Sequence, residues 1–291
     1  MRSHRLLGVL GKTLVGFGLT TLAFLAYQLW GTWLIQHWSQ QNLRAAIAPR
    51  EPVAQSVAKH YSPPQIGGAI GVIDIPSIGV NKAVVQGVGE ANLAEGPGHY
   101  PGTPMPGERG NVGIAGHRTT FGGPFYRLNY LKPGNLIFLT TSAGTFRYLV
   151  QRSLVVKPTD TSVVGPSNAN ILTLTTCTPL FSAADRLVVV ASLQGKPWTP
   201  PSGGNTPSRH PGAAPVSTPW IYSLASLGGV GSPYLAPFAW GAAVLLVGSV
   251  LIRLMGQTGR RILVWLPGAA VVACIVFVFF TSLNQVFPPS L

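Results

Sequence analysis

The chain has 291 residues and a formal net charge of +13, from 20 Lys and Arg against 7 Asp and Glu. Only 9% of the residues are charged and 46% are hydrophobic, whereas soluble domains average about 25% charged residues. A wholly soluble globular protein is therefore not expected, and this composition excludes disorder for most of the chain. Two cysteines are too few for a disulfide framework.

The positive charge does not form one basic patch. Residues 66–195 hold nine Lys or Arg and six Asp or Glu, so their net charge is only +3. Most of the remaining excess lies beside long apolar segments. Nucleic-acid binding requires clustered Lys and Arg, often with stacking aromatic side chains, and we therefore expect no nucleic-acid partner.

Three apolar segments, 13–35, 235–252 and 262–283, lack charged side chains. At about 1.5 Å per residue the first, with 23 residues, covers a hydrocarbon core of ~30 Å. A cleaved signal peptide is the alternative for this segment, but its apolar region would span only about 7–15 residues. A buried helical hairpin is the alternative for the other two. We predict three transmembrane helices.

Basic residues orient these helices, because positively charged loops stay in the cytoplasm. Arg2 and Arg5 precede the first segment, and Arg253, Arg260 and Arg261 lie between the second and third. The prediction is a multi-pass protein of the cell membrane whose middle region is extracellular. Its parts are a cytoplasmic N-terminus (1–12), an anchor (13–35), an extracellular stalk (36–65), an extracellular domain (66–195), a linker rich in Pro, Gly and Ser (196–234), a helix (235–252), a cytoplasmic loop (253–261), a helix (262–283) and an extracellular tail (284–291).

The extracellular domain has the pattern of an all-β domain. Short segments rich in β-branched residues alternate with turns that contain Gly and Pro. Only 124–131 has a helical pattern, and it is short. Seven or eight strands in about 130 residues indicate a closed barrel or a sandwich. The predicted strands are 69–75, 82–85, 111–115, 136–141, 145–156, 171–176 and 187–193.

Three side chains of this domain form a possible nucleophilic set. Cys177 follows one predicted strand, His117 follows another, and Arg186 precedes a third. A thiol can attack a carbonyl, an imidazolium can protonate the leaving amine, and a guanidinium can donate to the oxyanion. Taken singly, each residue has a simpler explanation: a buried apolar cysteine, a histidine of a turn, and a surface arginine paired with Asp185.

Three local sequences together resemble the sortase family. They are TLTTC at 173–177 followed by Arg186, NVGIAGHR at 111–118, and GPGHYPGT at 96–103, which is most similar to class E members from actinobacteria. The resemblance extends over about 68–193. It implies the eight-stranded sortase β-barrel, in addition to the three transmembrane α-helices.

The resemblance also implies roles for residues. Cys177 would be the nucleophile, His117 the acid and base, and Arg186 the group that stabilises the oxyanion and positions substrate. Tyr100 occupies the position of the class E tyrosine near the substrate groove, and Thr175 and Thr176 precede the nucleophile as expected substrate contacts.

The reaction of the family is transpeptidation. An exported protein with a C-terminal sorting signal, L-P-x-T-G or L-A-x-T-G, would be cleaved between Thr and Gly and transferred to an amine of a cell-wall precursor. No cofactor is implied, and no metal site is expected, because His99, His117 and one thiol are a thin ligand set. A cysteine peptidase that uses water and a non-catalytic envelope scaffold remain the alternatives.

Two features depart from the family. The two C-terminal apolar segments are unusual, and 36–65 contains no Asp-Pro-aromatic lid, which favours anchoring of single proteins over pilus assembly. Cys274, inside the third apolar segment, is expected to be a packing residue. Ordinary pKa values of about 8.5 and 6.5 would leave only ~1% of molecules with both a thiolate and an imidazolium at pH 7.

Overall fold

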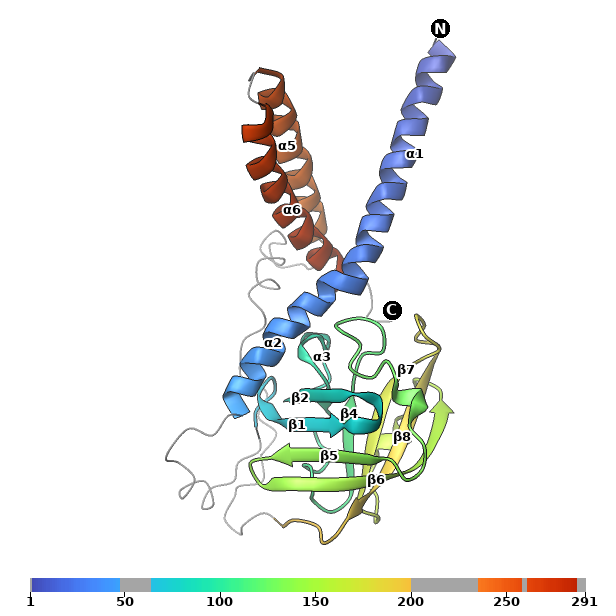
Figure 1. The fold of residues 1–291 in the computed structure, drawn as a ribbon. Coiled ribbons are helices and arrows are strands. Elements are labelled where there is room, and N and C mark those ends of the chain that lie inside the picture. The colour runs from blue at the N-terminus through green and yellow to red at the C-terminus, as the bar shows by residue number, and fades with distance from the viewer. Residues whose placement is uncertain (1, 48–63, 200–234, 258–260, 287–291) are drawn as a thin grey trace. The chain divides into compact units, whose positions relative to one another are not determined.

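The computed structural model describes residues 2–47, 64–199, 235–257 and 261–286 (Figure 1). The chain divides into two compact units, one made of residues 1–31 and 219–289 and the other of residues 32–218 with the last two residues. The first unit is helical and the second contains the β domain. Most of the predicted linker 196–234, and parts of the predicted stalk, cytoplasmic loop and tail, lie outside the described residues.

The helical unit contains helix α1 (Arg2–Ala26), a π-helix (Tyr27–Gly31), and helices α5 (Ala236–Gln257) and α6 (Arg261–Val286). Helices α5 and α6 pack side by side (Figure 1). The π-helix contacts α6, because the Tyr27 hydroxyl and Thr281 Oγ1 form a hydrogen bond of 2.9 Å. All three predicted apolar segments are thus helical.

Within the described residues, one apolar helix is long enough to cross a membrane, at Leu14–Ile47. The apolar stretches Ala236–Val250 and Gly268–Leu283 are shorter than 18 residues. At about 1.5 Å per residue, such stretches fall short of a ~30 Å hydrocarbon core. The prediction of three transmembrane helices is therefore supported for the N-terminal helix only, and a multi-pass arrangement is not supported.

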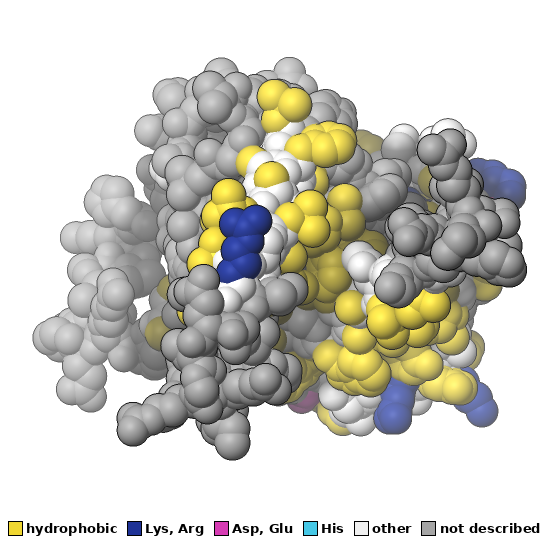
Figure 2. Space-filling model, turned by 90° about the horizontal axis from the view of Figure 1, so that it is seen from above, with side chains coloured by type: hydrophobic (Ala, Val, Ile, Leu, Met, Phe, Trp, Pro, Cys, Tyr) yellow, Lys and Arg dark blue, Asp and Glu magenta, His cyan; other side chains and the backbone are white. Residues whose placement is uncertain are grey.

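The described surface carries many hydrophobic side chains and few acidic ones on the face shown in Figure 2. Exposed large apolar side chains of the helical unit include Leu14, Leu19 and Leu22 of α1 and Phe238 and Leu245 of α5. Several large apolar side chains exposed on the same helices are characteristic of surfaces that contact a membrane or a partner protein. Cys274 is also exposed, so its predicted packing role is wrong.

The second unit is built around a closed barrel of eight strands in the order β1-β2-β3-β4-β7-β8-β6-β5. This confirms the eight-stranded barrel predicted from the sequence. Most neighbours are antiparallel, but β2–β3 and β4–β7 are parallel. The strands are β1 (Ala69–Ile75), β2 (Val80–Gln86), β3 (Gly98–His99), β4 (Asn111–Ala115), β5 (Leu136–Thr141), β6 (Gly144–Val156), β7 (Ile171–Thr178) and β8 (Asp185–Gln194).

Alternation along the strands fills the barrel. Val112 and Ile114 of β4, and Leu172 and Leu174 of β7, belong to one buried apolar cluster. Side chains at the intervening positions must point to the outer face of the sheet, because successive side chains of a strand alternate. The outer face of β4 and β7 therefore carries the odd-numbered residues of both strands.

Three local features differ from the prediction. Helix α3 (Glu90–Glu95) and the two-residue strand β3 were missed, because neither is long enough to show a periodic pattern. The segment 124–131 contains only a 3₁₀ turn at Leu128–Tyr130. Residues 36–47 do not belong to a stalk, because helix α2 (Thr32–Ile47) extends through them and packs against the barrel.

Helix α2 covers an edge that short β3 leaves open. Of the residues of β2, only Val85 and Gln86 pair with β3. The preceding residues of β2 therefore lack a neighbouring strand on that side. The Gln40 amide takes the place of that strand: its Oε1 accepts from Ala83 N at 2.8 Å, and its Nε2 donates to Ala83 O at 3.0 Å. The same Nε2 also lies 3.0 Å from Glu95 O of α3. Leu43 packs on Ala83 and Val85.

Replacing Gln40 with leucine is expected to lower the free energy of unfolding by about 2–3 kcal/mol, because it leaves buried backbone groups of Ala83 and Glu95 without partners. Chemical denaturation of the full chain measures this change. Gln41→Leu is the matched control, since Gln41 is exposed on the same helix and bonds only to His37. Equal stabilities of the two variants would contradict the role of the amide.

Candidate active site

Cys177 lies near the end of β7, on the outer face of the barrel. It shares the odd-numbered face with Thr173 and Thr175, while Leu172 and Leu174 fill the core. The thiol residue is half-buried and forms no disulfide. Its side chain therefore does not point into the apolar interior.

The pairing of β4 with β7 places the segment that leads to His117 beside the segment that leads to Cys177. The strands run parallel with Asn111 opposite Ile171 and Ala115 opposite Thr175. This register continues beyond the strand, because Gly116 N donates to Thr175 O at 3.0 Å. If the same offset continued for one more residue, His117 would lie level with Cys177.

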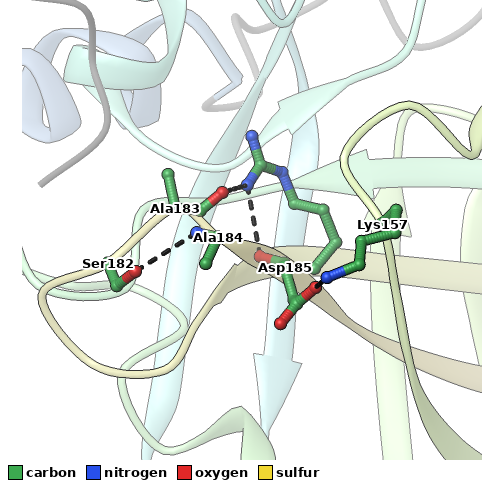
Figure 3. A network of polar contacts seen from close by, with 6 residues as sticks. Lys157, Ser182, Ala183, Ala184 and Asp185 are labelled. Atoms are coloured by element: carbon green, nitrogen blue, oxygen red, sulfur yellow. Dashed lines mark hydrogen bonds and ion pairs between the residues drawn. The ribbon is translucent and has the colours of Figure 1, made fainter.

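Arg186 is the direct partner of Cys177 across the β7–β8 ladder. Directly opposed residues of an antiparallel pair project from the same face of the sheet. The Arg186 Nη1 group donates to Ala183 O at 3.1 Å and to Asp185 O at 3.2 Å. Figure 3 shows these two residues with Lys157, whose Nζ lies 2.7 Å from an Asp185 carboxylate oxygen. The alternative explanation of Arg186, an ion pair with Asp185, is not what the structure shows, since the Asp185 carboxylate pairs with Lys157.

His117 is enclosed in this conformation. The residue is 6% exposed, its Nε2 is buried without a hydrogen-bond partner, and its Nδ1 lies 3.3 Å from Thr120 Oγ1. The Phe121 ring packs against the imidazole, with 5.0 Å between ring centroids. Burial disfavours the charged imidazolium and lowers the pKa of His117 to about 4. At pH 7 only ~0.1% of the imidazole would carry the second proton, which is well below the ~25% expected at an ordinary pKa.

Arg118 is a residue that the sequence reasoning missed. Its Nη1 donates to Cys177 O at 3.2 Å and to Thr178 Oγ1 at 2.7 Å, and its Nη2 donates to Asn129 Oδ1 at 3.1 Å. The guanidinium therefore fixes the end of the strand that carries the thiol. Its place directly after His117, in the sequence quoted for the resemblance, was the available signal.

Tyr100 and Thr175 contact each other, and Thr175 lies two residues before Cys177 on the same face of β7. The Tyr100 hydroxyl and Thr175 Oγ1 are 3.0 Å apart. The ring lies flat over Gly113 of β4, where an added Cβ would come within 2.9 Å of Tyr100 Cδ2. Thr176 is different: it is 3% exposed and its hydroxyl donates to Gly116 O at 2.7 Å, so it joins β4 to β7 instead of facing a substrate.

His99 is part of the scaffold that supports Tyr100. It is fully buried, its Nδ1 lies 2.8 Å from Gln86 Oε1, and its Nε2 lies 2.9 Å from Pro104 O and 3.0 Å from Thr103 Oγ1. Burial lowers its pKa. Within the described part of the chain, no group of three or more His, Cys, Asp and Glu side chains could hold a metal ion.

Two cavities lie at the far end of the same face, where β4 and β7 begin. One, of about 280 Å³, is lined by Thr103, Asn111 and residues 164–167; the other, of about 450 Å³, is lined by Asn168, Asn170 and Pro197. Arg109, Gly110 and Ser167 border both. From Ile171 to Cys177, β7 rises by ~20 Å at about 3.3 Å per residue. The face between thiol and cavities thus has the length of a short extended peptide.

Comparison with known proteins decides the family. Residues 73–194 match the sortase domain. Sortase D of Bacillus subtilis is 31% identical over 152 residues, which are 48% of this chain and 75% of that protein. The chain belongs to the sortase family. The sortases are cysteine transpeptidases, so the enzyme class expected from the sequence is confirmed.

Other similar sortases carry the class E name. Sortase SrtE1 of Streptomyces coelicolor is 29% identical over 196 residues, which are 62% of this chain and 55% of that protein. The chain thus spans little more than half the length of this relative. The structure of sortase E from Streptomyces avermitilis is 35% identical, covers 45% of this chain and 91% of that chain, and has a TM-score of 0.42. The resemblance to class E sortases is confirmed by the sequence identity to SrtE1.

Proposed function

We propose that this protein is a membrane-anchored transpeptidase that cleaves an L-A-x-T-G-like or L-P-x-T-G-like signal of exported proteins and transfers them to a cell-wall amine. One observation carries the proposal: β4, β7 and β8 are adjacent strands, Ala115 pairs with Thr175, and Cys177 pairs with Arg186, so His117, two residues beyond Ala115, follows β4 at the end of the face that carries the thiol. The N-terminal apolar helix supports anchoring at the membrane. The basic residues before it favour a cytoplasmic N-terminus and an extracellular catalytic unit.

The proposed chemistry has two acyl transfers. The Cys177 thiolate attacks the carbonyl carbon of the Thr–Gly bond, and the carbon–nitrogen bond breaks while His117 gives its proton to the leaving glycine amine. The acceptor amine then attacks the thioester and gives a proton to His117, a new amide bond forms, and the sulfur leaves as thiolate. Arg186 donates to the oxyanion in both steps. A guanidinium has five N–H donors, so its bonds to Ala183 O and Asp185 O leave others for this task.

The signal would lie extended on the outer face of β4 and β7. Four residues before the scissile bond span ~13 Å, which fits within the ~20 Å between Cys177 and the start of β7. Tyr100 and Thr175 would border the signal residues nearest the thiol. The cavity beside Thr103 and Asn111 lies at the other end of this face. This placement supports binding of a short peptide in one defined register.

The test compares products with and without an added amine. The purified full chain in detergent is mixed with a peptide that contains L-A-x-T-G, and products are identified by mass spectrometry. A peptide joined to the amine supports transpeptidation, whereas hydrolysis alone would favour a cysteine peptidase. No cleavage of any signal peptide would favour the scaffold.

Replacing Arg186 with lysine is expected to lower kcat by roughly 10²-fold, because an ammonium group cannot reproduce the directed N–H donors of the guanidinium. Peptide cleavage assays measure the change. Arg152→Lys on exposed β6 is the matched control and should leave kcat unchanged. A kcat equal to that of the unmodified protein would exclude Arg186 from the oxyanion site.

A further inference from the structure

The loop that follows His117 closes over its imidazole. Phe121 is 3% exposed and stacks on the ring, and Thr120 Oγ1 lies 3.3 Å from Nδ1. The other nitrogen, Nε2, is buried and has no hydrogen-bond partner. An imidazole in this position cannot exchange a proton with a bound peptide until the loop moves.

Helix α2 holds this loop from the other side. Phe121 N donates to Thr32 Oγ1 at 3.0 Å, and the Thr32 side chain is fully buried. One turn further along α2, Gln36 packs against Gly122, where any Cβ would collide with the Gln36 amide. The Gln36 Oε1 atom accepts from Lys82 Nζ at 3.1 Å, so this contact is tied to β2 as well. The first turns of α2 thus fasten the loop to the barrel.

The closed loop contains a strained residue and unpaired polar atoms that favour its opening. Phe121 has a φ of +49°, in the left-handed region that residues with a Cβ rarely occupy. Three buried polar atoms around the loop, Gln36 Nε2, His117 Nε2 and Arg118 Nε, have no hydrogen-bond partner. Opening of the loop would relax the backbone at Phe121 and let water form hydrogen bonds with these atoms. The closed loop keeps the Phe121 ring buried and the Phe121 backbone N–H bonded to Thr32. Opposed contributions of this kind make the loop sensitive to the loss of one bond.

We propose that Thr32 is a positioning residue for His117: by accepting the hydrogen bond from Phe121 N, it holds Phe121 over the imidazole, so helix α2 controls access to the histidine. The inference rests on the proposed catalytic role of His117. It gives α2 a part in the reaction that a plain stalk would not have.

The charged and titratable groups around this loop come from three elements. The Arg118 guanidinium follows His117 and is bonded to the end of β7, Lys82 of β2 is bonded to Gln36, and Cys177 belongs to β7, which pairs with the strand that ends two residues before His117. Burial is the cause of the lowered pKa of His117, and the Phe121 ring is one of the groups packed against the imidazole. The pKa of His117 therefore reports whether the loop is closed.

The test uses the full chain in detergent with Thr32→Val, which keeps the shape of the side chain and removes the acceptor. We expect NMR to show the pKa of His117 rising from about 4 toward the ordinary 6.5. Modification of His117 by diethyl pyrocarbonate, followed by mass spectrometry, should become about tenfold faster, as expected for the loss of one hydrogen bond of ~1.4 kcal/mol. Cleavage of the signal peptide should also become faster.

Thr32→Ser keeps the acceptor and should restore the behaviour of the unmodified protein. Thr140→Val is the matched control, since Thr140 is exposed on β5 and its hydroxyl contacts only Thr145. Phe121→Gly is a second variant, because glycine accepts the positive φ while removing the ring that covers the imidazole. It should also accelerate modification.

Unchanged modification rates and an unchanged pKa of His117 in both Thr32→Val and Phe121→Gly would overturn the inference. The measurements do not need a working thiol and are repeated with Cys177→Ala. Faster modification of His117 in Thr32→Val, in a protein that cleaves no signal peptide, would support the control of access to His117 and refute the proposed function. Normal cleavage of the signal peptide with an unchanged rate of His117 modification would support the proposed function and refute the control of access to His117.

Discussion

Replacing Cys177 with alanine is expected to lower the rate of signal-peptide cleavage by at least ~10³-fold, because no other group of the site can form the acyl-enzyme. The reason is structural as well as chemical. Cys177 is the described residue of the outer β7 face that lies between the register positions of His117 and Arg186. Alanine preserves the strand and its ladder, so the fold should survive the change.

Cleavage rates and trapping of a thioester by mass spectrometry measure this effect. Cys274→Ala is the matched control: it removes the only other thiol of the chain, which is exposed on α6, and should leave both readouts unchanged. Residual transfer by Cys177→Ala at more than a few per cent of the normal rate would refute the nucleophile. In that outcome another group would have to form the covalent intermediate.

The second large effect concerns pH and stability. The pKa of His117 is about 4 in the folded protein and about 6.5 in an unfolded chain. As the pH falls below 6.5, the unfolded chain gains a proton at this position while the folded protein does not. The free energy of unfolding should therefore fall by up to ~3 kcal/mol between pH 6.5 and pH 4 on account of His117 alone.

His117→Gln should remove this contribution, and the difference between the two proteins in denaturant titrations at pH 7 and pH 4.5 isolates it. His99 remains in both proteins, and its lowered pKa adds acid sensitivity of the same sign to each. Parallel stability curves for the two proteins would show that the imidazole is not enclosed in solution.

Much of the barrel could be predicted because its strands alternate. The odd and even positions of β4 and β7 separate apolar from polar or small residues, so the sequence shows both the strands and their inner face. The ends of these strands carry His117, Cys177 and Arg186. The local sequences around these residues are therefore enough to predict a candidate site at this end of the barrel.

The contacts around the site could not be predicted in the same way. The role of Arg118 depends on carbonyl and hydroxyl groups about sixty residues away in β7, and the burial of His117 depends on a left-handed Phe121 and a threonine in a helix before the barrel. These are single tertiary contacts without periodicity. For the C-terminal segments the error was in the other direction: low charge density alone predicted two further membrane spans, whereas their described apolar stretches are shorter than 18 residues.

The short β3 strand has a practical consequence for work on isolated fragments. Gln40, Leu43 and Arg44 of α2 protect the backbone of β2 that β3 does not reach. A recombinant fragment started at residue 66, where the sequence alone places the domain boundary, would expose this edge to solvent. Such an edge can recruit strands from neighbouring molecules, so fragments that begin at Thr32 should remain monodisperse where shorter ones precipitate.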